Sequence, residues 1–159
     1  MNRTYLLLGS NMGNSLQQLG IAQKHIEKNI GTITRSSSLY QTAAWGKTDQ
    51  PDFLNQVIVV ETGLTATATM QAILSIEKKM GRLRTEKNAP RIIDIDILLF
   101  NKDIIETPIL SVPHPQLQYR RFVLIPLNEL SPNLIHPVLK KTIHQLLRVC
   151  PDNLAVKKK

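Results

Sequence analysis

Six segments in the first 100 residues carry the apolar spacing of strands or helices, and their order constrains the fold more than any other feature of the chain. Alternating or continuous apolar runs indicate strands, and an apolar repeat of three to four residues indicates helices. The order is strand, helix, strand, strand, helix, strand, which is the split βαβ pattern of a ferredoxin-like fold. The expected strands cover residues 5–8, 33–40, 53–61 and 93–100, and the expected helices cover residues 16–30 and 65–80.

We therefore expect an α+β protein with a βαββαβ antiparallel sheet, both long helices on one face and the other face left for a site. The later residues predict a C-terminal hairpin and short helices that partly cover this free face. They comprise a hairpin turn at residues 101–103, an apolar run over residues 122–130 and a last helix over residues 139–149. A length of 159 residues suits one core, so we expect residues 1–159 to form a single domain.

Residue types at the segment ends predict the helix boundaries. Ser15 is the candidate N-cap of the first helix, and Gly31 is its candidate C-cap. Gly81 is expected to end the second helix. Glycines also lie between the first strand and the first helix, but the Lys and Ser/Thr of a Walker phosphate loop do not follow Gly13, so we favour a plain turn there.

The stretch from residue 81 to residue 100 places cations beside paired acids. Four basic residues oppose one acid, Glu86, in its first half: Arg82, Arg84, Lys87 and Arg91. In its second half Asp94 and Asp96 alternate with isoleucines, so both carboxylates share one strand face, roughly 6.6 Å apart along the strand. Carboxylates hold hard cations and guanidinium groups hold phosphate oxygens, so the stretch indicates a site for a metal-bound nucleotide.

A plainer interpretation of the two aspartates is the wet face of a half-buried sheet. Two observations weigh against it. Asp is a poor strand residue, and the strand continues into Leu98-Leu99-Phe100, which suits an interior position.

Two more residues are candidates for the same site. Glu77 lies in the apolar stripe of the second expected helix, where an acid is rare unless it is paired. It either reaches solvent at the helix end or faces the same cleft as the arginines. His114 lies between two prolines that hold the backbone extended. A lone loop histidine is more often inert surface, but Arg120 and Phe122 follow closely.

Composition limits the partners and the compartment. The formal net charge of +8 favours an anionic partner, which could be nucleic acid, a membrane surface or a phosphorylated small molecule. Three of these charges belong to residues 157–159, which we expect to be frayed. The single cysteine, Cys150, allows no internal disulfide, and neither a signal peptide nor a membrane span is expected. We expect a cytoplasmic protein.

A series of motifs occurs in order along the chain: Leu8-Gly9-Ser10-Asn11, Gln50-Pro51-Asp52-Phe53-Leu54-Asn55, Gly81-Arg82-x-Arg84, Pro90-Arg91-x-x-Asp94-x-Asp96-x-Leu98-x-Phe100, Val112-Pro113-His114 and Arg120-x-Phe122-x-Leu124-x-Pro126-Leu127. Each motif alone is weak. Together, in a chain of this length, they resemble the 6-hydroxymethyl-7,8-dihydropterin pyrophosphokinases of folate biosynthesis, and the resemblance covers most of the chain.

The resemblance implies an enzyme that transfers the β,γ-diphosphate of ATP to the hydroxymethyl group of the pterin and releases AMP. It implies ATP as co-substrate and two Mg²⁺ ions held by Asp94 and Asp96. The residues implied around ATP are Glu77, Arg82, Arg84, Arg91, Ile97, His114 and Arg120, with Arg82 and Arg91 as the catalytic pair. The residues implied around the pterin are Phe53 and Phe122 on its two faces, Asn55 on its ring edge, and Thr42, Ala43 and Trp45 nearby.

With these substrates we expect no nucleic acid or membrane partner, and a monomer. The chain departs from the family in two places: Asn88 or Ala89 stands where relatives can carry an aromatic residue in a segment one residue longer, and Pro115 follows His114.

The alternative is a ferredoxin-like nucleic-acid-binding module, which would also explain the positive charge. It predicts an RNP-like pattern of aromatic residues that the sequence lacks, and Asp94 and Asp96 would repel phosphate without a metal. A small regulatory domain that binds a ligand without chemistry is a third possibility, and the paired aspartates argue against it.

Overall fold

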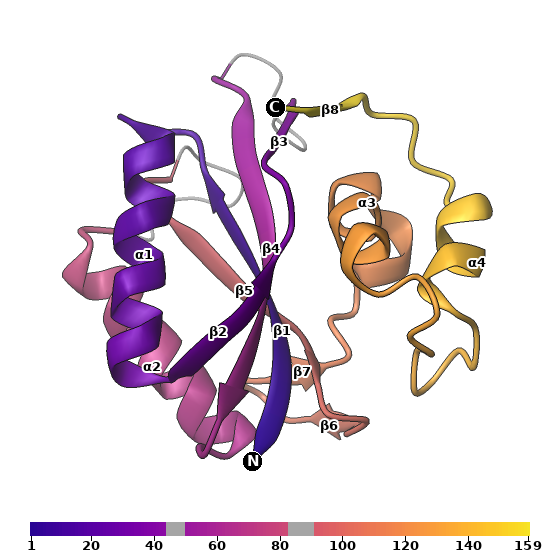
Figure 1. The fold of residues 1–159 in the computed structure, drawn as a ribbon, viewed down its shortest axis with the longest axis horizontal. Helices are drawn as coiled ribbons and strands as arrows, with labels where there is room; N and C mark the ends of the chain where they lie inside the picture. The colour runs from indigo at the N-terminus through magenta and orange to yellow at the C-terminus, as the bar shows by residue number, and fades with distance from the viewer. Residues whose placement is uncertain (44–49, 83–90) are drawn as a thin grey trace.

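The computed structural model describes residues 1–43, 50–82 and 91–159, which form three layers (Figure 1). One layer holds the two long helices, the middle layer is an antiparallel sheet, and the third layer holds two short helices from the C-terminal part of the chain. The elements up to residue 100 are β1 (Asn2–Ser10), α1 (Ser15–Asn29), β2 (Gly31–Ser36), β3 (Tyr40–Thr42), β4 (Phe53–Thr62), α2 (Ala66–Lys79) and β5 (Asp94–Phe100). The expected ferredoxin-like fold is confirmed.

The sheet has the order β5-β1-β4-β3-β8, where β8 is Val156–Lys158 near the end of the chain, and β2 also pairs with β4. The single strand expected over residues 33–40 was wrong, because β2 and β3 are separate strands that pair with different ends of β4. Ser37 occupies the break between them. Its hydroxyl accepts a hydrogen bond from the backbone N–H of Val57 at 3.0 Å, and its own backbone N–H donates to the Val57 carbonyl at 2.8 Å. β4 therefore keeps its backbone hydrogen bonds where the neighbouring strand is interrupted.

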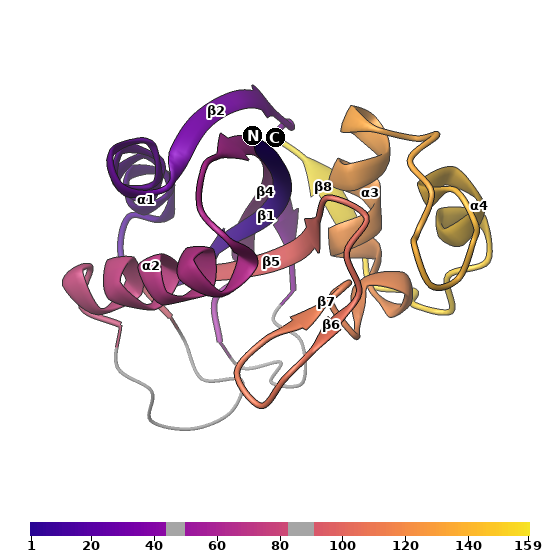
Figure 2. The same cartoon turned by 90° about the horizontal axis from the view of Figure 1, so that it is seen from below.

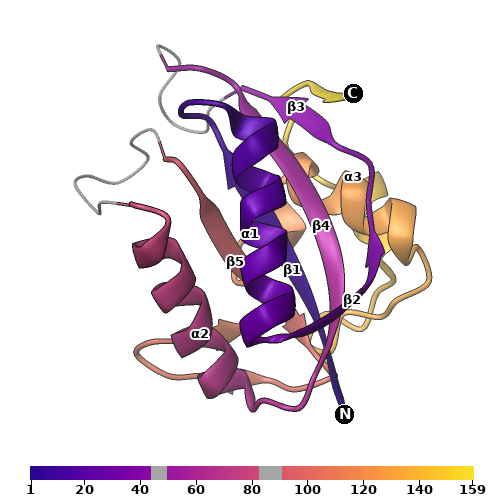
Figure 3. The ribbon, with the colours of Figure 1, turned by 60° about the vertical axis from the view of Figure 1, so that its left-hand side comes forward.

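Each face of the sheet carries its own core. Leu6 and Leu8 of β1 point towards α1 and α2, which lie side by side over one face (Figure 3). Tyr5 and Leu7 point the other way, towards α3 (Arg121–Leu130) and α4 (Ile143–Arg148) (Figure 2). The C-terminal helices thus cover part of the second face, as expected, and the hollow described below lies on the same face. Because β1 is apolar on both faces, both faces need a covering layer, and only the end of the second face beyond Leu7 remains for a site.

β5 contains one irregularity that decides where its side chains point. The β1–β5 register shifts between Tyr5 and Leu6, so Leu98 has no partner across the ladder, which is the arrangement of a β-bulge. As a result Leu98 and Leu99 both pack in the α3 side core, and Phe100 returns to the α1 side. The Leu98 carbonyl accepts a hydrogen bond from the backbone N–H of His114 at 2.9 Å.

The helix ends differ from expectation in three places. Asn14, and not Ser15, caps α1, since its side-chain oxygen accepts from the backbone N–H of Gln17 at 3.1 Å. Gly31 does not cap this helix but begins β2, where a Cβ would lie 2.0 Å from the Glu61 carbonyl oxygen. The expected helix over residues 139–149 begins only at Ile143. Its cap is Thr142 in a capping box, and Lys140 has a left-handed φ of 59° that no helix allows. Gly81, with φ 88°, ends α2 as expected.

The end of the chain agrees with expectation in part. The expected hairpin forms from β6 (Ile105–Glu106) and β7 (Ser111–Val112), but its turn lies at residues 107–110 and not at residues 101–103. The strand β8 (Val156–Lys158) pairs with β3 instead of fraying. The backbone N–H of Lys159 donates to the Leu39 carbonyl at 2.9 Å, so the end of the chain completes the edge of the sheet. Among the described residues, no helix is both long and apolar enough to cross a membrane.

A carboxylate in α3 ties the third layer to the sheet. Glu129 accepts hydrogen bonds from the hydroxyl of Tyr40 at 2.6 Å and from the backbone N–H of Ser38 at 3.1 Å. Burial and this bond to Glu129 raise the pKa of Tyr40 to about 12. Burial alone would raise the pKa of Glu129, but the bonds from Tyr40 and Ser38 outweigh it and lower that pKa below its usual value.

Candidate active site

A hollow of about 300 Å³ lies where the second face of the sheet extends beyond the α3 layer. Strands β1, β4 and β5 form its floor, the start of α3 forms one wall, and chain segments near residues 42 and 91 border it. Its lining residues are Leu7, Gly9, Thr42, Ala43, Phe53, Asn55, Arg82, Arg91, Asp94, Asp96, His114, Arg120 and Phe122.

Gly9 lies at the centre of the floor. It pairs with Asp94 of β5 on one side and with Asn55 of β4 on the other, so the three residues form one row across three strands. Neighbouring strands are about 4.8 Å apart, so the carboxylate and the amide stand on backbones roughly 10 Å apart. Because Gly9 has no side chain, the space above it stays open between them.

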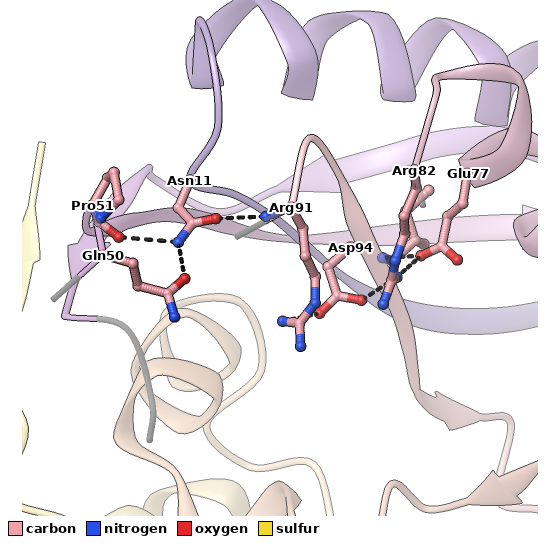
Figure 4. Close-up of polar contacts among 8 residues, drawn as sticks. Asn11, Gln50, Pro51, Glu77, Arg82, Arg91 and Asp94 are labelled. Atoms are coloured by element: carbon pink, nitrogen blue, oxygen red, sulfur yellow. Dashed lines mark hydrogen bonds and ion pairs between the residues drawn. The ribbon is translucent and has the colours of Figure 1, made fainter. Parts of the chain in front are cut away.

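A buried ion-pair network borders the acidic side of the hollow (Figure 4). Nη1 of Arg82 lies 2.6 Å from the Glu77 carboxylate and 2.7 Å from the Asp94 carboxylate. The same Glu77 oxygen accepts a hydrogen bond from the backbone N–H of Ile95 at 2.9 Å. Burial alone lowers the pKa of Arg82, but Asp94 and Glu77 outweigh this and raise it, so the guanidinium stays charged. Glu77 is 3% exposed and lies behind Arg82, so the alternative in which it reaches solvent was wrong.

Asp94 and Asp96 both line the hollow, as the strand alternation predicts. Burial raises the pKa of Asp96 to about 8, and the nearby Asp94 and Glu77 carboxylates add to the shift, while Arg82 and Arg120 oppose it. Ionising this buried carboxylate beside two others is costly, and a bound hard divalent cation would offset that cost, so this donor set fits such a cation. Within the described ranges, no three His, Cys, Asp or Glu side chains gather as a complete metal-binding group. Magnesium sites in proteins commonly include substrate phosphates and water among their ligands.

Two phenylalanines, each with an arginine nearby, line the other side of the hollow. The guanidinium carbon of Arg91 lies 5.9 Å from the ring centre of Phe53, and that of Arg120 lies 5.7 Å from the ring centre of Phe122. Nη1 of Arg91 also approaches the Asp94 carboxylate at 3.5 Å. Arg91 thus lies between the aromatic and the acidic parts of the site.

His114 presents a neutral imidazole. Its Nδ1 accepts a hydrogen bond from the backbone N–H of Gln116 at 3.1 Å, which places the ring proton on Nε2. Burial lowers the pKa of His114, Arg120 lowers it further, and Asp94 opposes the shift. The ring can therefore donate a hydrogen bond at neutral pH without adding charge.

A second, smaller hollow of about 210 Å³ shares Asp96 and His114 with the first. Its other lining residues are Met70, Ile95, Ile97, Ile109, Leu110, Ser111 and Pro115. Ile97 lines this apolar hollow and not the first one.

The structure brings most of the expected site residues together. Eleven of them line the first hollow, Ile97 lines the second, and Glu77 supports Arg82 from behind. Trp45 and Arg84 lie outside the described residues. Sequence reasoning gave no role to Leu7 and Gly9, although the motif around Gly9 was noted. The odd-numbered face of β1 would have identified both residues, but only after the strand pairing was known.

The fold and the hollow together define a class: a ferredoxin-like α+β enzyme whose site suits metal-bound phosphate beside a flat ring. Residues 5–132 match the family described as 7,8-dihydro-6-hydroxymethylpterin-pyrophosphokinase. The chain is 39% identical over 145 residues to the 2-amino-4-hydroxy-6-hydroxymethyldihydropteridine pyrophosphokinase of Aquifex aeolicus, covering 91% of this chain and 90% of the relative. It is 39% identical to the enzyme of the same name from Synechocystis, covering 88% of this chain and 72% of the relative.

Among solved structures, the fold resembles that of Plasmodium falciparum HPPK-DHPS, with a TM-score of 0.78 and 22% identity. The match covers 92% of this chain and 45% of that longer chain. The chain belongs to the 7,8-dihydro-6-hydroxymethylpterin-pyrophosphokinase family, and it is a pyrophosphokinase of folate biosynthesis.

Proposed function

We propose that the protein transfers the β,γ-diphosphate of ATP to the hydroxymethyl group of 6-hydroxymethyl-7,8-dihydropterin and releases AMP. The hydroxymethyl oxygen forms a bond to the β-phosphorus, the bond from the β-phosphorus to the oxygen it shares with the α-phosphorus breaks, and AMP leaves with that oxygen. The hydroxyl proton is lost to the surroundings. The observation that carries the proposal is the row of Asp94, Gly9 and Asn55 across the floor, because a carboxylate and an amide face one hollow on either side of Gly9. Asp96, two residues along β5, lines the same hollow.

Asp94 and Asp96 are the proposed ligands of two Mg²⁺ ions. Magnesium in proteins is usually held by one or two carboxylates, with substrate phosphates and water completing its shell. Bound there, the ions would neutralise the charge that develops on the phosphates during transfer. Asp94 and Asp96 line the same hollow, and a cation bound by them would offset the burial and the repulsion that raise the pKa of Asp96.

The arginines are proposed to hold and neutralise the phosphates. Phosphoryl transfer depends mainly on positioning and on charge stabilisation by groups already in place. The side chain of Arg82 is held between two carboxylates, so its orientation is set before substrate arrives. Arg91 and Arg120 line the same hollow, and the planar guanidinium suits phosphate oxygens.

The pterin is proposed to stack between Phe53 and Phe122 in the aromatic part of the hollow, because flat rings are held well by aromatic faces. Asn55 would read the ring edge. Its amide nitrogen donates to the Thr42 hydroxyl at 2.9 Å, which turns its oxygen towards the Gly9 side of the floor as an acceptor. A ring placed there would have its hydroxymethyl group on the side of the carboxylates.

The adenosine part of ATP is proposed to enter the second hollow. Its walls are mostly apolar, and it joins the first hollow at Asp96 and His114, so a nucleotide could run from Ile97 to the paired carboxylates. His114 would donate from Nε2 to this nucleotide.

Product analysis tests the proposed reaction. The protein is incubated with Mg²⁺ and ATP, with and without the pterin, and nucleotides are separated while phosphorus NMR follows the transferred groups. We expect AMP and a pterin diphosphate ester, both only when the pterin is present. Formation of ADP instead of AMP, or AMP without the pterin, would refute the proposed transfer.

A further inference from the structure

Asn11 connects two segments that are distant in sequence (Figure 4). It lies in the turn after β1, is 3% exposed, and donates from its amide nitrogen to the Gln50 side-chain oxygen at 2.7 Å and to the Pro51 carbonyl at 3.0 Å. Its side-chain oxygen accepts from the backbone N–H of Arg91 at 2.8 Å, and its own backbone N–H donates to the Arg91 carbonyl at 3.1 Å.

This use of a carboxamide is specific. A buried polar side chain costs free energy unless its hydrogen bonds are made, and here both amide protons and the oxygen have partners. An aspartate could keep the bond from Arg91, but it would place an oxygen against the Pro51 carbonyl, which has no hydrogen to offer. Only a carboxamide of this length donates to one segment while accepting from the other.

The two connected segments carry site residues. Pro51 lies two residues before Phe53, the first residue of β4 and one proposed face of the pterin slot. Arg91 is held at both its N–H and its carbonyl by Asn11, and its guanidinium reaches both the Phe53 ring and the Asp94 carboxylate. Asn11 touches neither hollow directly, since it is not among the lining residues.

We propose that Asn11 is a positioning residue that sets Arg91 and Phe53 in register across the site. Asn11 thereby aligns the pterin ring with the ATP phosphates that Arg91 contacts. The inference rests on the proposed function, because the register matters only if both substrates occupy the hollow together. Without Asn11, Arg91 and Phe53 remain chemically unchanged. The hydrogen bonds that fix their two segments relative to each other are lost.

The main variant is Asn11→Ala, and the matched control is Asn14→Ala in the same turn. Asn14 caps α1 and lines neither of the two hollows, so its loss should lower stability by about 1 kcal/mol and leave the hydrogen bonds of Asn11 in place. We expect Asn11→Ala to lower kcat by about 10- to 100-fold, since small misplacements of reacting groups have effects of that size. KM for ATP should change little. Asn14→Ala should melt at a lower temperature but keep the wild-type kcat.

A double-mutant cycle tests whether the effect passes through Arg91. In an Arg91→Ala background, Asn11→Ala should lower kcat by less than about threefold, because the group that it positions is already gone. Asn11→Asp separates the two connections. It should leave kcat near wild type and raise KM for the pterin by about tenfold, because it disturbs the segment at Pro51 and keeps the bond to Arg91.

Amide hydrogen exchange, measured without substrates, tests the structural part of the proposal separately from activity. Exchange of the Arg91 amide should speed up in Asn11→Ala but not in Asn11→Asp or Asn14→Ala. An unchanged exchange rate of the Arg91 amide, or an unchanged kcat despite faster exchange, would overturn the proposal.

If the wild type forms no AMP, the proposed function fails and the proposal falls with it, while the exchange result still decides whether Asn11 holds Arg91. If Asn11→Ala does not fold, Asn11→Asp carries the test: unchanged kinetics would overturn the proposal.

Discussion

Gly9 and Asn55 lie opposite each other on β1 and β4, and a Cβ on Gly9 would come within 2.8 Å of the Asn55 side-chain oxygen. Gly9→Ala should therefore displace the amide proposed to read the pterin. We expect at least tenfold weaker pterin binding and nearly unchanged ATP binding, measured by calorimetric titration. Gly20→Ala is the control: Gly20 has open space around it within α1, so alanine there should raise stability by about 0.5–1 kcal/mol and leave binding unchanged.

Phe53→Ala and Phe122→Ala should weaken pterin binding far more than ATP binding. Stacking of an aromatic side chain on a base-like ring is worth roughly 1–3 kcal/mol by alanine substitution. Calorimetric titration of each variant with each ligand measures the difference. An equal loss for both ligands would show that these rings support the fold and do not form the slot.

Arg82 and Arg91 should respond differently to removal. The Arg82 side chain is 12% exposed and joins two carboxylates, so Arg82→Ala should lower both kcat and the free energy of unfolding, the latter by about 3–5 kcal/mol. Arg91 has a longer contact, at 3.5 Å, and a more exposed side chain, so Arg91→Ala should lower kcat by about 100-fold with little loss of stability. Steady-state kinetics and urea unfolding separate the two effects. A change in KM alone would mean that both arginines only hold ATP.

Asp96→Asn should separate metal binding from folding. Without metal, burial and the neighbouring carboxylates raise the pKa of Asp96 to about 8, so the folded state disfavours its charged form, and the variant with an uncharged Asn of the same shape should melt at the wild-type temperature or slightly above it. With Mg²⁺ and ATP, wild type should gain about 2.7 kcal/mol at 100 times the Kd, and the variant should gain much less and lose most turnover.

Thermal melts and an AMP-release assay measure these outcomes for Asp96→Asn. Asp103→Asn, in the exposed turn after β5, serves as the control. Full activity at ordinary magnesium would exclude Asp96 as a metal ligand, and a large loss of metal-free stability would assign it a structural role.

Glu129→Gln should make stability depend less on pH. Hydrogen bonds from Tyr40 and Ser38 lower the pKa of Glu129 below its ordinary value of 4.5, so the folded state favours the charged form. Its contribution is present above about pH 4.5 and is lost as the pH falls through the lowered pKa. Thermal melts should therefore show the variant below wild type at pH 7, with the gap narrowing as the pH falls below about 4.5. Glu106→Gln, in exposed β6, should track wild type throughout; a constant gap for Glu129→Gln would exclude the ionic contribution.

Local periodicity was enough to predict the order of strands and helices along the first 100 residues, and the shared face of Asp94 and Asp96. Each of these features depends on neighbours in sequence. The separation of β2 from β3 was not predictable in this way. It depends on how Ser37 pairs with Val57 of a strand 20 residues later. The covering of the second face and the pairing of β8 likewise depend on contacts between distant segments.

The candidate site was likewise predictable in part, and the rest depends on contacts between distant segments. The charged and aromatic residues were identifiable from their types and from the family motifs, since chemistry limits what can stand there. The role of Gly9 was not, because a glycine contributes only the space that its neighbours leave. Only the strand pairing shows that this space lies between Asp94 and Asn55.

The unpaired Leu98 in β5 connects the length of this strand to the active site, because the Leu98 carbonyl accepts a hydrogen bond from the backbone N–H of His114. Deleting one residue there would let β1 and β5 pair without interruption and give a more regular sheet. It would also remove the carbonyl that accepts the hydrogen bond from the backbone N–H of His114 and take the Leu98 side chain out of the core beneath α3, while Phe100 would keep its face. We expect such a deletion to be tolerated poorly despite the better ladder, so insertions and deletions should be far rarer in this strand than in the exposed hairpin that follows it.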